Sequence, residues 1–266
     1  MNKPLIDRLN IGNLTRLWKK MGAQVTAVQP SGSLNTSISW PYRVWLDGIT
    51  EKNNALEIVN HLSDIPPHAI VPVWHATDDA IAGQRIFSEH GFELRLSQTA
   101  MFLDLKDYQP TTCPAIQIEQ VQSPKETEVW TNIASEAFGY VIDVNVIRRI
   151  AGDPEIRLLL VYDNDEPAAT ALLFKTENIL GVHLVGVPEK HRGKGLAYAL
   201  MQRVIEHGYL WGARYITLQA SSAGIGIYKK LGFKQQFFIN SYQRIQNVEH
   251  IRRHQPFSQD DKVHQK

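Results

Sequence analysis

The segment from Val185 to Ala197 holds the residues whose types and spacing could do chemistry. The segment is expected to run from the end of a strand to the start of a helix, with Gly193 and Gly195 at the junction. Glycine lets the backbone approach a ligand closely and adopt a positive φ, and the N–H groups in the first turn of a helix have no intrahelical partner. Those donors and the helix dipole favour binding of an anion such as a phosphate.

Basic residues add positive charge to the same segment. Lys190, Arg192 and Lys194 lie close together along the chain, so a pyrophosphate fits here better than a neutral group. His191, between them, is expected to face solvent. The segment lacks both the spacing before Gly-Lys-Ser/Thr of a P-loop and the third glycine of a dinucleotide-binding fold. It therefore predicts a pyrophosphate site of another kind.

The run Arg-x-x-Gly-x-Ala from Arg192 to Ala197 resembles the Arg/Gln-x-x-Gly-x-Gly/Ala signature of the GCN5-related N-acetyltransferase (GNAT) superfamily. The similarity extends to the tripeptide Val187-Pro188-Glu189 before the loop and to the block from Tyr228 to Phe233 after it. The two blocks together are more specific than the loop alone. The resemblance covers residues 116–245.

This resemblance implies how a coenzyme would bind. Acetyl-CoA would lie in a gap where one strand splays from its neighbour, with the pantetheine pairing like an added strand and the pyrophosphate on the loop backbone. Ser221 stands where many members of the family carry Asn, although another subset shows Ala-Ser-x-x-Gly as here. The residues that match the family's coenzyme contacts are Val185, Val187, Arg192, Gly193, Lys194, Gly195, Leu196, Ala197 and Ser221.

The resemblance also implies direct transfer, without a covalent enzyme intermediate. The acceptor amine would attack the thioester carbonyl, and Tyr228 matches the family's usual general acid, which protonates the departing thiolate. A phenol with a reference pKa near 10 is protonated at neutral pH and can serve in this way. Alternatively, the Tyr228 ring packs in the core and its hydroxyl bonds a carbonyl.

The general base is less well defined by the sequence. His183 lies on an expected strand, with the same side-chain parity as Val185 and Val187, and is similar in position to a strand histidine of arylalkylamine-type members. An imidazole with a reference pKa near 6.5 could take the proton of the amine. Glu177 or a chain of waters would serve equally well, and a structural role for His183 is the alternative.

Composition limits the remaining possibilities. The 266 residues are 43% hydrophobic and 21% charged, which favours two modest globular domains over a disordered or fibrous chain. Lys and Arg (28) nearly balance Asp and Glu (27), which argues against a nucleic-acid partner. Cys113 is the single cysteine, so no thiolate zinc site or internal disulfide is expected. No signal-peptide or membrane-spanning pattern occurs, so we expect a cytoplasmic protein with no membrane partner. We also expect no bound metal.

Periodicity and turn residues predict the elements of the second half. The pattern indicates strands over 116–121, 157–162, 168–176, 179–187, 215–220 and 233–242, and helices over 125–138, 144–150, 196–209 and 225–231.

The first half is expected to hold a helix over 14–21, a loop over 29–36 and a strand over 38–47. A helix over 54–62, a strand over 69–74, a helix from Asp78 or Asp79 to His90 and a strand over 92–105 follow. The aromatic residues Trp40, Tyr42, Trp45 and Trp74 are expected to pack in the core, with an aromatic acceptor pocket as the alternative.

One internal echo joins the halves, because Ile86–Phe92 is similar to Ile227–Phe233 and both runs precede a closing strand. We therefore expect an α/β (α+β) protein of two GNAT-like mixed-sheet domains. A truncated, degenerate copy spans 1–108, a linker 109–115, the complete acyl-CoA N-acyltransferase fold 116–246 and a polar tail 247–266. The first copy's equivalent loop, 47–53, has two acids and no arginine, so one active site is expected, in the second copy.

These observations favour an N-acetyltransferase that uses acetyl-CoA and a small amine or amino-acid-like acceptor. A non-catalytic acyl-CoA sensor, or an acyltransferase with another donor or acceptor, remains the alternative. Acceptors are held by variable loops such as Gly139–Asn145, with the first half as a further contributor to the acceptor pocket. The oligomeric state, monomer or homodimer, is left open.

Overall fold

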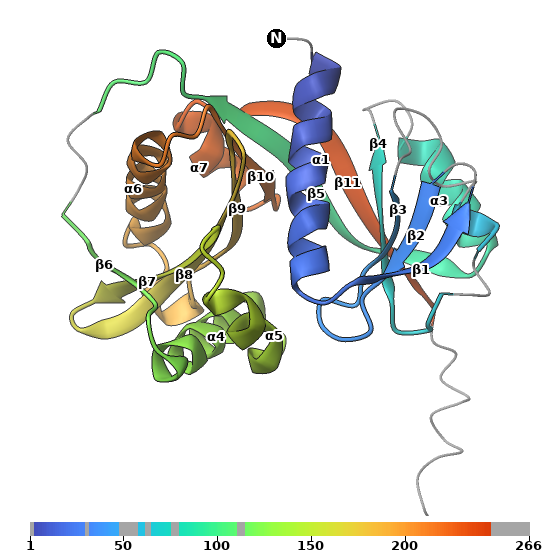
Figure 1. The fold of residues 1–266 in the computed structure, drawn as a ribbon, viewed down its shortest axis with the longest axis horizontal. Coiled ribbons are helices and arrows are strands. Elements are labelled where there is room, and N and C mark those ends of the chain that lie inside the picture. The colour runs from blue at the N-terminus through green and yellow to red at the C-terminus, as the bar shows by residue number, and fades with distance from the viewer. Residues whose placement is uncertain are drawn as a thin grey trace, which may run out of the picture.

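The computed structural model describes residues 3–29, 32–47, 58–61, 65–75, 80–110 and 115–245. Two sheets run through this part of the chain, one of three strands and one of eight (Figure 1). Within the described residues, no helix is long and apolar enough to cross a membrane. The mixed α/β fold class is confirmed.

The C-terminal half alternates strands and helices. Local signals set its boundaries: Ser123 and Glu126 form a reciprocal capping box at the start of α4, and Gly139 ends that helix with φ +72°. Its elements are β6 (Gln117–Gln120), α4 (Pro124–Phe138), α5 (Val144–Ala151), β7 (Ile156–Asp163), β8 (Glu166–Thr176), β9 (Ile179–Gly186), α6 (Leu196–Leu210), β10 (Tyr215–Ala220), α7 (Ile225–Lys230) and β11 (Lys234–Arg244).

The N-terminal half begins with a long helix. Its elements are α1 (Lys3–Lys20), β1 (Gln24–Gln29), β2 (Gly32–Thr36), β3 (Val44–Asp47), β4 (Ile70–His75), α3 (Ala80–Glu89) and β5 (Phe92–Asp104). Strands β1, β2 and β3 form the small sheet. Figure 1 shows α1 between the two halves, and its C-terminal part packs into the core of the C-terminal half through Leu14, Leu17 and Trp18.

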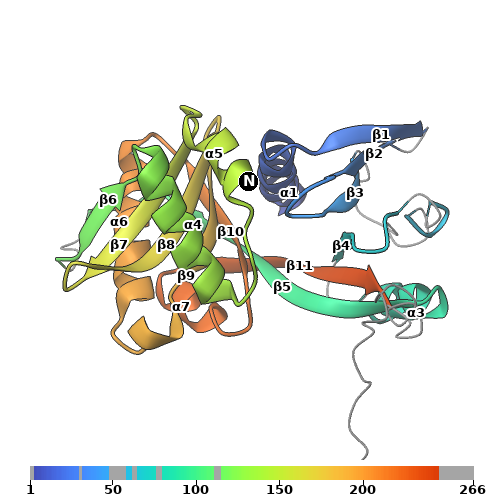
Figure 2. The same cartoon turned by 90° about the horizontal axis from the view of Figure 1, so that it is seen from below.

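The large sheet joins the halves, in the order β4-β11-β5-β10-β9-β8-β7-β6. All neighbours are antiparallel except β9 and β10, which are parallel. The long strands β5 and β11 run side by side from one half into the other, as Figure 2 shows. Helices α4 and α5 with α1 cover one face of the C-terminal sheet, and α6 with α7 covers the other.

Every predicted element of the second half is present, with ends within three residues of the expected ones. The first half departs further. The expected loop over 29–36 is wrong, because Gln29 pairs with Gly32 and the segment forms the β1–β2 hairpin. The expected strand over 38–47 is too long, because a turn in which Tyr42 N–H donates to the Ser39 carbonyl precedes β3. Helix α1 begins at Lys3 rather than at Leu14.

The polar tail 247–266, most of the helix expected over 54–62 and the degenerate loop 48–53 lie outside the described residues. The same holds for most of the linker 109–115. The aromatic residues Trp40 and Trp45 are buried in the core with Trp18, and Trp74 packs against this cluster, as the core-packing interpretation expects. For Tyr42 that interpretation is wrong, because the residue is 38% exposed.

Candidate active site

The strands β9 and β10 diverge at one end of the sheet. Their parallel pairing runs only from Ile179–Val182 opposite Tyr215–Leu218. Beyond it, β10 stays paired with β5 as far as Ala220, and β9 stays paired with β8 as far as Gly186. From His183 to Gly186, the edge of β9 on the β10 side therefore pairs with no strand in the described chain. This is the splay that the family resemblance implies, and it leaves a strand edge that an extended ligand can join.

A bulge changes the side-chain direction within this stretch. The β8–β9 register shifts between Thr170 and Leu172, and Leu184 adopts φ +50°. Val182, Val185 and Val187 consequently face the α6 side of the sheet, whereas His183 and Leu184 face the opposite side. The prediction that His183 shares the parity of Val185 and Val187 is wrong, because strict alternation fails at a bulge.

The loop after β9 has the geometry of an anion site. A short 3-10 helix, Glu189–His191, leads into a turn in which Gly193 has φ +79° and Gly195 φ +78°, after which α6 begins. Backbone N–H groups from Gly193 to Tyr198 donate to no other group in the described chain. These donors at a helix N-terminus fit a phosphate or pyrophosphate.

The charged side chains around the loop are partly neutralised. Lys194 Nζ lies 2.5 Å from Asp163 Oδ2, and His191 Nδ1 lies 3.3 Å from the same oxygen. The Lys194 ammonium, helped by His191, holds the pKa of Asp163 below its usual range. His191 is only 4% exposed, so the expectation that it faces solvent is wrong. Asp163, which the sequence analysis missed, fixes both basic residues.

Arg192 shapes the loop. Its Nε donates to the Val187 carbonyl at 3.0 Å and its Nη2 to the Ala137 carbonyl at 3.2 Å. The guanidinium therefore ties the end of β9 to the end of α4. The sequence gave no signal for the contact between Arg192 and Ala137, because the two residues are distant along the chain.

Tyr228 lies on α7 with its ring packed edge-on against Phe233, at 5.7 Å between ring centroids. Its ring also packs against the cluster between α6 and the sheet. Burial raises the pKa of Tyr228 to about 12, so the phenol stays protonated through the physiological range. The hydroxyl has no partner among the described residues, which leaves its proton available to a ligand.

His183 is enclosed beneath α1. Its Nε2 lies 3.0 Å from Asn13 Oδ1, and burial lowers its pKa to about 4, partly offset by a hydrogen bond with Gln219. Asn13 also donates to the Phe174 carbonyl and to Thr176 Oγ1. The imidazole is therefore neutral at neutral pH and held by α1. The other candidate base, Glu177, is exposed at the opposite end of β9, where it pairs with Arg16.

Ser221 lies on the exposed turn that joins β10 to α7, at the same end of the sheet as the loop. Its carbonyl accepts from the Gly224 and Ile225 N–H groups. Leu196 is buried in the core on the α6 side, and Ala197 is half-buried. The structure thus brings the loop, the free edge of β9 and Ser221 to one end of the sheet.

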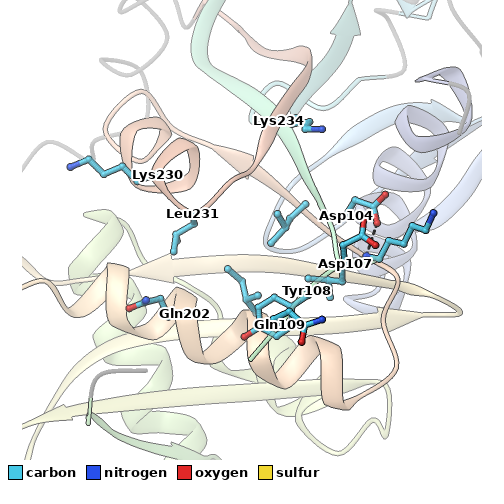
Figure 3. A pocket seen from close by; sticks show the side chains of 12 residues that line it. Asp104, Asp107, Tyr108, Gln109, Gln202, Lys230, Leu231 and Lys234 are labelled. Atoms are coloured by element: carbon cyan, nitrogen blue, oxygen red, sulfur yellow. Dashed lines mark hydrogen bonds between the residues drawn. The ribbon is translucent and has the colours of Figure 1, made fainter. Parts of the chain in front are cut away.

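A cavity of about 580 Å³ lies at the other end of β10 (Figure 3). Asp104, which lines the cavity, pairs with Tyr215 at the start of β10. The loop between β9 and α6 instead follows the C-terminal end of β9. The remaining labelled lining residues are Asp107, Tyr108, Gln109, Gln202, Lys230, Leu231 and Lys234. Neither Tyr228 nor the Arg192–Gly195 turn borders this cavity, so we do not assign the reaction to it.

Comparisons with known proteins agree with this geometry. Residues 117–233 match the model of the Acetyltransferase (GNAT) family. The chain is similar in structure to a GCN5-related N-acetyltransferase from Kribbella flavida, with a TM-score of 0.66 and 16% identity over 90% of this chain and 95% of that one. It is also similar to a GCN5-related N-acetyltransferase from Sphaerobacter thermophilus, with a TM-score of 0.54 and 21% identity over 72% of this chain and 65% of that one. The chain therefore carries an acetyltransferase domain of the GNAT family over residues 117–233, and by that family it is an acyltransferase.

Proposed function

We propose that this protein transfers the acetyl group of acetyl-CoA directly to the amine of a small-molecule or amino-acid-like acceptor. The observation that carries the proposal is the divergence of β9 from β10 immediately before the N-terminal turn of α6. A strand edge for pantetheine and a set of free N–H groups for pyrophosphate then follow one another along the chain.

The backbone supplies most of the proposed coenzyme site. The free edge at Val185 to Val187 would pair with pantetheine, and the N–H groups from Gly193 to Ala197 would hold the pyrophosphate. Lys194 adds positive charge, and Arg192 fixes the turn through two carbonyls. Ser221 would border the coenzyme from the β10–α7 turn.

The proposed reaction forms one bond and breaks another. The amine nitrogen attacks the thioester carbonyl carbon, the carbon–sulfur bond breaks, and the sulfur takes a proton from Tyr228. The amine loses a proton to solvent, through water or a base. His183 is a weak candidate for that base because its pKa lies far below that of an amine and α1 encloses it. Water is the better candidate.

The experiment that tests the coenzyme site is calorimetric titration of the full chain with acetyl-CoA, for the parent and for Arg192→Glu. The substitution removes both carbonyl contacts and places a negative charge beside the pyrophosphate, so we expect acetyl-CoA affinity to fall at least about tenfold, as loss of a charged hydrogen bond does. Arg203→Glu, an equal charge change on the exposed surface of α6, is the control and should retain affinity.

Two outcomes would contradict the proposal. If the parent shows no saturable acetyl-CoA binding, the assignment of acetyl-CoA as the donor is wrong. If Arg192→Glu binds acetyl-CoA as tightly as the parent, the assignment of the loop as the pyrophosphate site is wrong. Release of free coenzyme A in the presence of mixed amines would separate an enzyme from a sensor that only binds acyl-CoA.

A further inference from the structure

Arg43 is a half-buried cation near the boundary between the two halves. It lies just before β3, and its Nε and Nη1 atoms are buried without a hydrogen-bond partner in the described chain. The guanidinium carbon lies 5.9 Å from the centroid of the Trp18 ring, and Arg43 interacts electrostatically with Tyr140. Burial lowers the pKa of Arg43 to about 10, and no described carboxylate offsets this effect. Enclosing an unpaired charge is costly, so the position is suited to an anion that arrives with a ligand.

Two more polar groups without partners lie on the same face of the small sheet. Ser37 N–H donates to the Arg43 carbonyl at 2.8 Å, and Asn35 pairs with Trp45 in the β2–β3 register. Directly paired residues, and residues two apart on one strand, share a face of a sheet, so Asn35, Ser37 and Arg43 lie on one face. Ser37 Oγ and Asn35 Oδ1 are also buried without a partner in the described chain.

This polar group connects to the proposed donor site through the loop between α4 and α5. The ring of Phe138 packs closely against Gly186, at the end of β9. A Cβ added at Gly186 would lie only 3.0 Å from this ring. The Phe138 ring lies 5.9 Å from that of Tyr140, and Tyr140 interacts electrostatically with Arg43 of the other half. Phe138 and Tyr140 therefore connect Arg43 to Gly186, the end of β9 where the thioester would lie in the proposed donor site.

We propose that the acceptor carries a free carboxylate, which binds the Arg43 guanidinium while the acceptor amine faces the thioester. A guanidinium donates strong, charge-assisted hydrogen bonds to carboxylate, and the Ser37 hydroxyl supplies a neighbouring donor. A single arginine with one hydroxyl suits a carboxylate better than a phosphate, which is usually held by several donors or a cluster of basic residues. The inference rests on the proposed function and names its acceptor class: amino acids and related amino carboxylates.

The experiment uses the full chain with coenzyme A and product-like probes. N-acetyl amino acids with apolar and polar side chains are compared with their C-terminal amides, which lack the carboxylate. Binding is followed by tryptophan fluorescence, since Trp18 and Trp45 lie on the same side as Arg43. The variants are Arg43→Gln, Arg43→Lys and the control Arg85→Gln, which removes an exposed arginine from α3.

We expect at least one acid to bind about 10- to 100-fold more tightly than its amide, the range for hydrogen bonds to a charged group. Arg43→Gln should abolish this preference, Arg43→Lys should retain part of it, and Arg85→Gln should retain all of it. The inference is overturned if no acid binds better than its amide, or if the preference survives Arg43→Gln.

Acetyl-CoA titration of each variant distinguishes this inference from the proposed function. If the parent fails to bind acetyl-CoA, the donor site itself is wrong. If all variants bind acetyl-CoA equally and acids show no advantage over amides, only the acceptor assignment fails. A melting temperature of Arg43→Gln near that of the parent would show that any loss in this variant comes from the charge and not from unfolding.

Discussion

His183 is buried and Tyr228 is half-buried, and burial acts on their pKa values in opposite directions. It lowers the pKa of the imidazole to about 4 and raises that of the phenol to about 12, because a low-dielectric environment disfavours the charged form of each group. Both side chains are therefore neutral across the physiological range. A neutral phenol can still give a proton, whereas a neutral imidazole with so low a pKa is a poor acceptor of one.

The hydroxyl of Tyr228 can be tested by Tyr228→Phe, which keeps the ring contact with Phe233. We expect turnover to fall about 100-fold, the lower range for loss of a general acid, while acetyl-CoA affinity stays within about twofold. Tyr209→Phe, on the exposed end of α6, is the control. Release of coenzyme A measures the rate. An unchanged rate in Tyr228→Phe would show that water or another group protonates the thiolate.

His183 makes stability depend on pH. Because its folded pKa of about 4 lies below the ordinary value of 6.5, the unfolded chain binds more protons between these two values. The free energy of unfolding should therefore be highest above pH 6.5 and fall by up to about 3 kcal/mol as the pH is lowered to 4. Urea unfolding at several pH values should show a smaller decrease for His183→Gln than for His90→Gln, which removes an exposed histidine. Equal slopes would contradict this assignment.

The N-terminus of α6 depends on backbone conformation at the scale of the element. At Gly195 a Cβ would meet nothing within 4 Å, yet φ is +78°, so strain and not crowding opposes a side chain there. The same turn aims its N–H groups at the proposed pyrophosphate site. A backbone that relaxed toward negative φ would turn some of these donors away.

Gly195→Ala should accordingly lower the free energy of unfolding by about 1 to 2 kcal/mol, the cost of a left-handed conformation for an L-residue. It should also weaken acetyl-CoA binding. Gly152→Ala is the matched control, since Gly152 has equally open space but φ −89°. Urea unfolding and calorimetry measure the two effects. If both variants lose stability equally, the positive φ is not the cause.

The whole molecule is organised around an exchange of strands between its halves. The order β4-β11-β5-β10 places each long final strand next to the penultimate strand of the other half. In both halves a helix and a glycine with positive φ precede that final strand, and a phenylalanine follows the glycine, at Gly91–Phe92 and Gly232–Phe233. This arrangement supports the proposal that the first half is a degenerate copy of the second, although the sheet does not divide at the expected linker.

Because β5 and β11 belong to one sheet, neither half can unfold without exposing the core of the other. We expect a single cooperative transition in urea, with tryptophan fluorescence and far-ultraviolet circular dichroism giving coincident midpoints. Trp45 reports on the first half and Trp130 on the second, so single-tryptophan variants serve as controls for each half. Two separated transitions would show that the halves are independent folding units.

The sequence by itself determined the elements of the second half, the turn proposed to bind an anion and the position of Tyr228 on α7. These features depend on neighbouring residues: apolar periodicity, Ser123 and Gly139 at helix ends, and paired glycines at a helix start. The β1–β2 hairpin was missed because its polar residues resemble a loop, and only pairing with β3 makes it a sheet.

Only the tertiary structure decided where side chains point and what surrounds them. The bulge at Leu184 placed His183 and Val185 on opposite faces of the sheet, because β8 contributes one residue fewer to the pairing than β9. Asp163 pairs with Lys194 and His191, which follow it by about thirty residues, and Arg43 interacts electrostatically with Tyr140 of the other half. Burial and electrostatic pairing depend on segments far apart in the chain, so patterns of near neighbours carry no information about them.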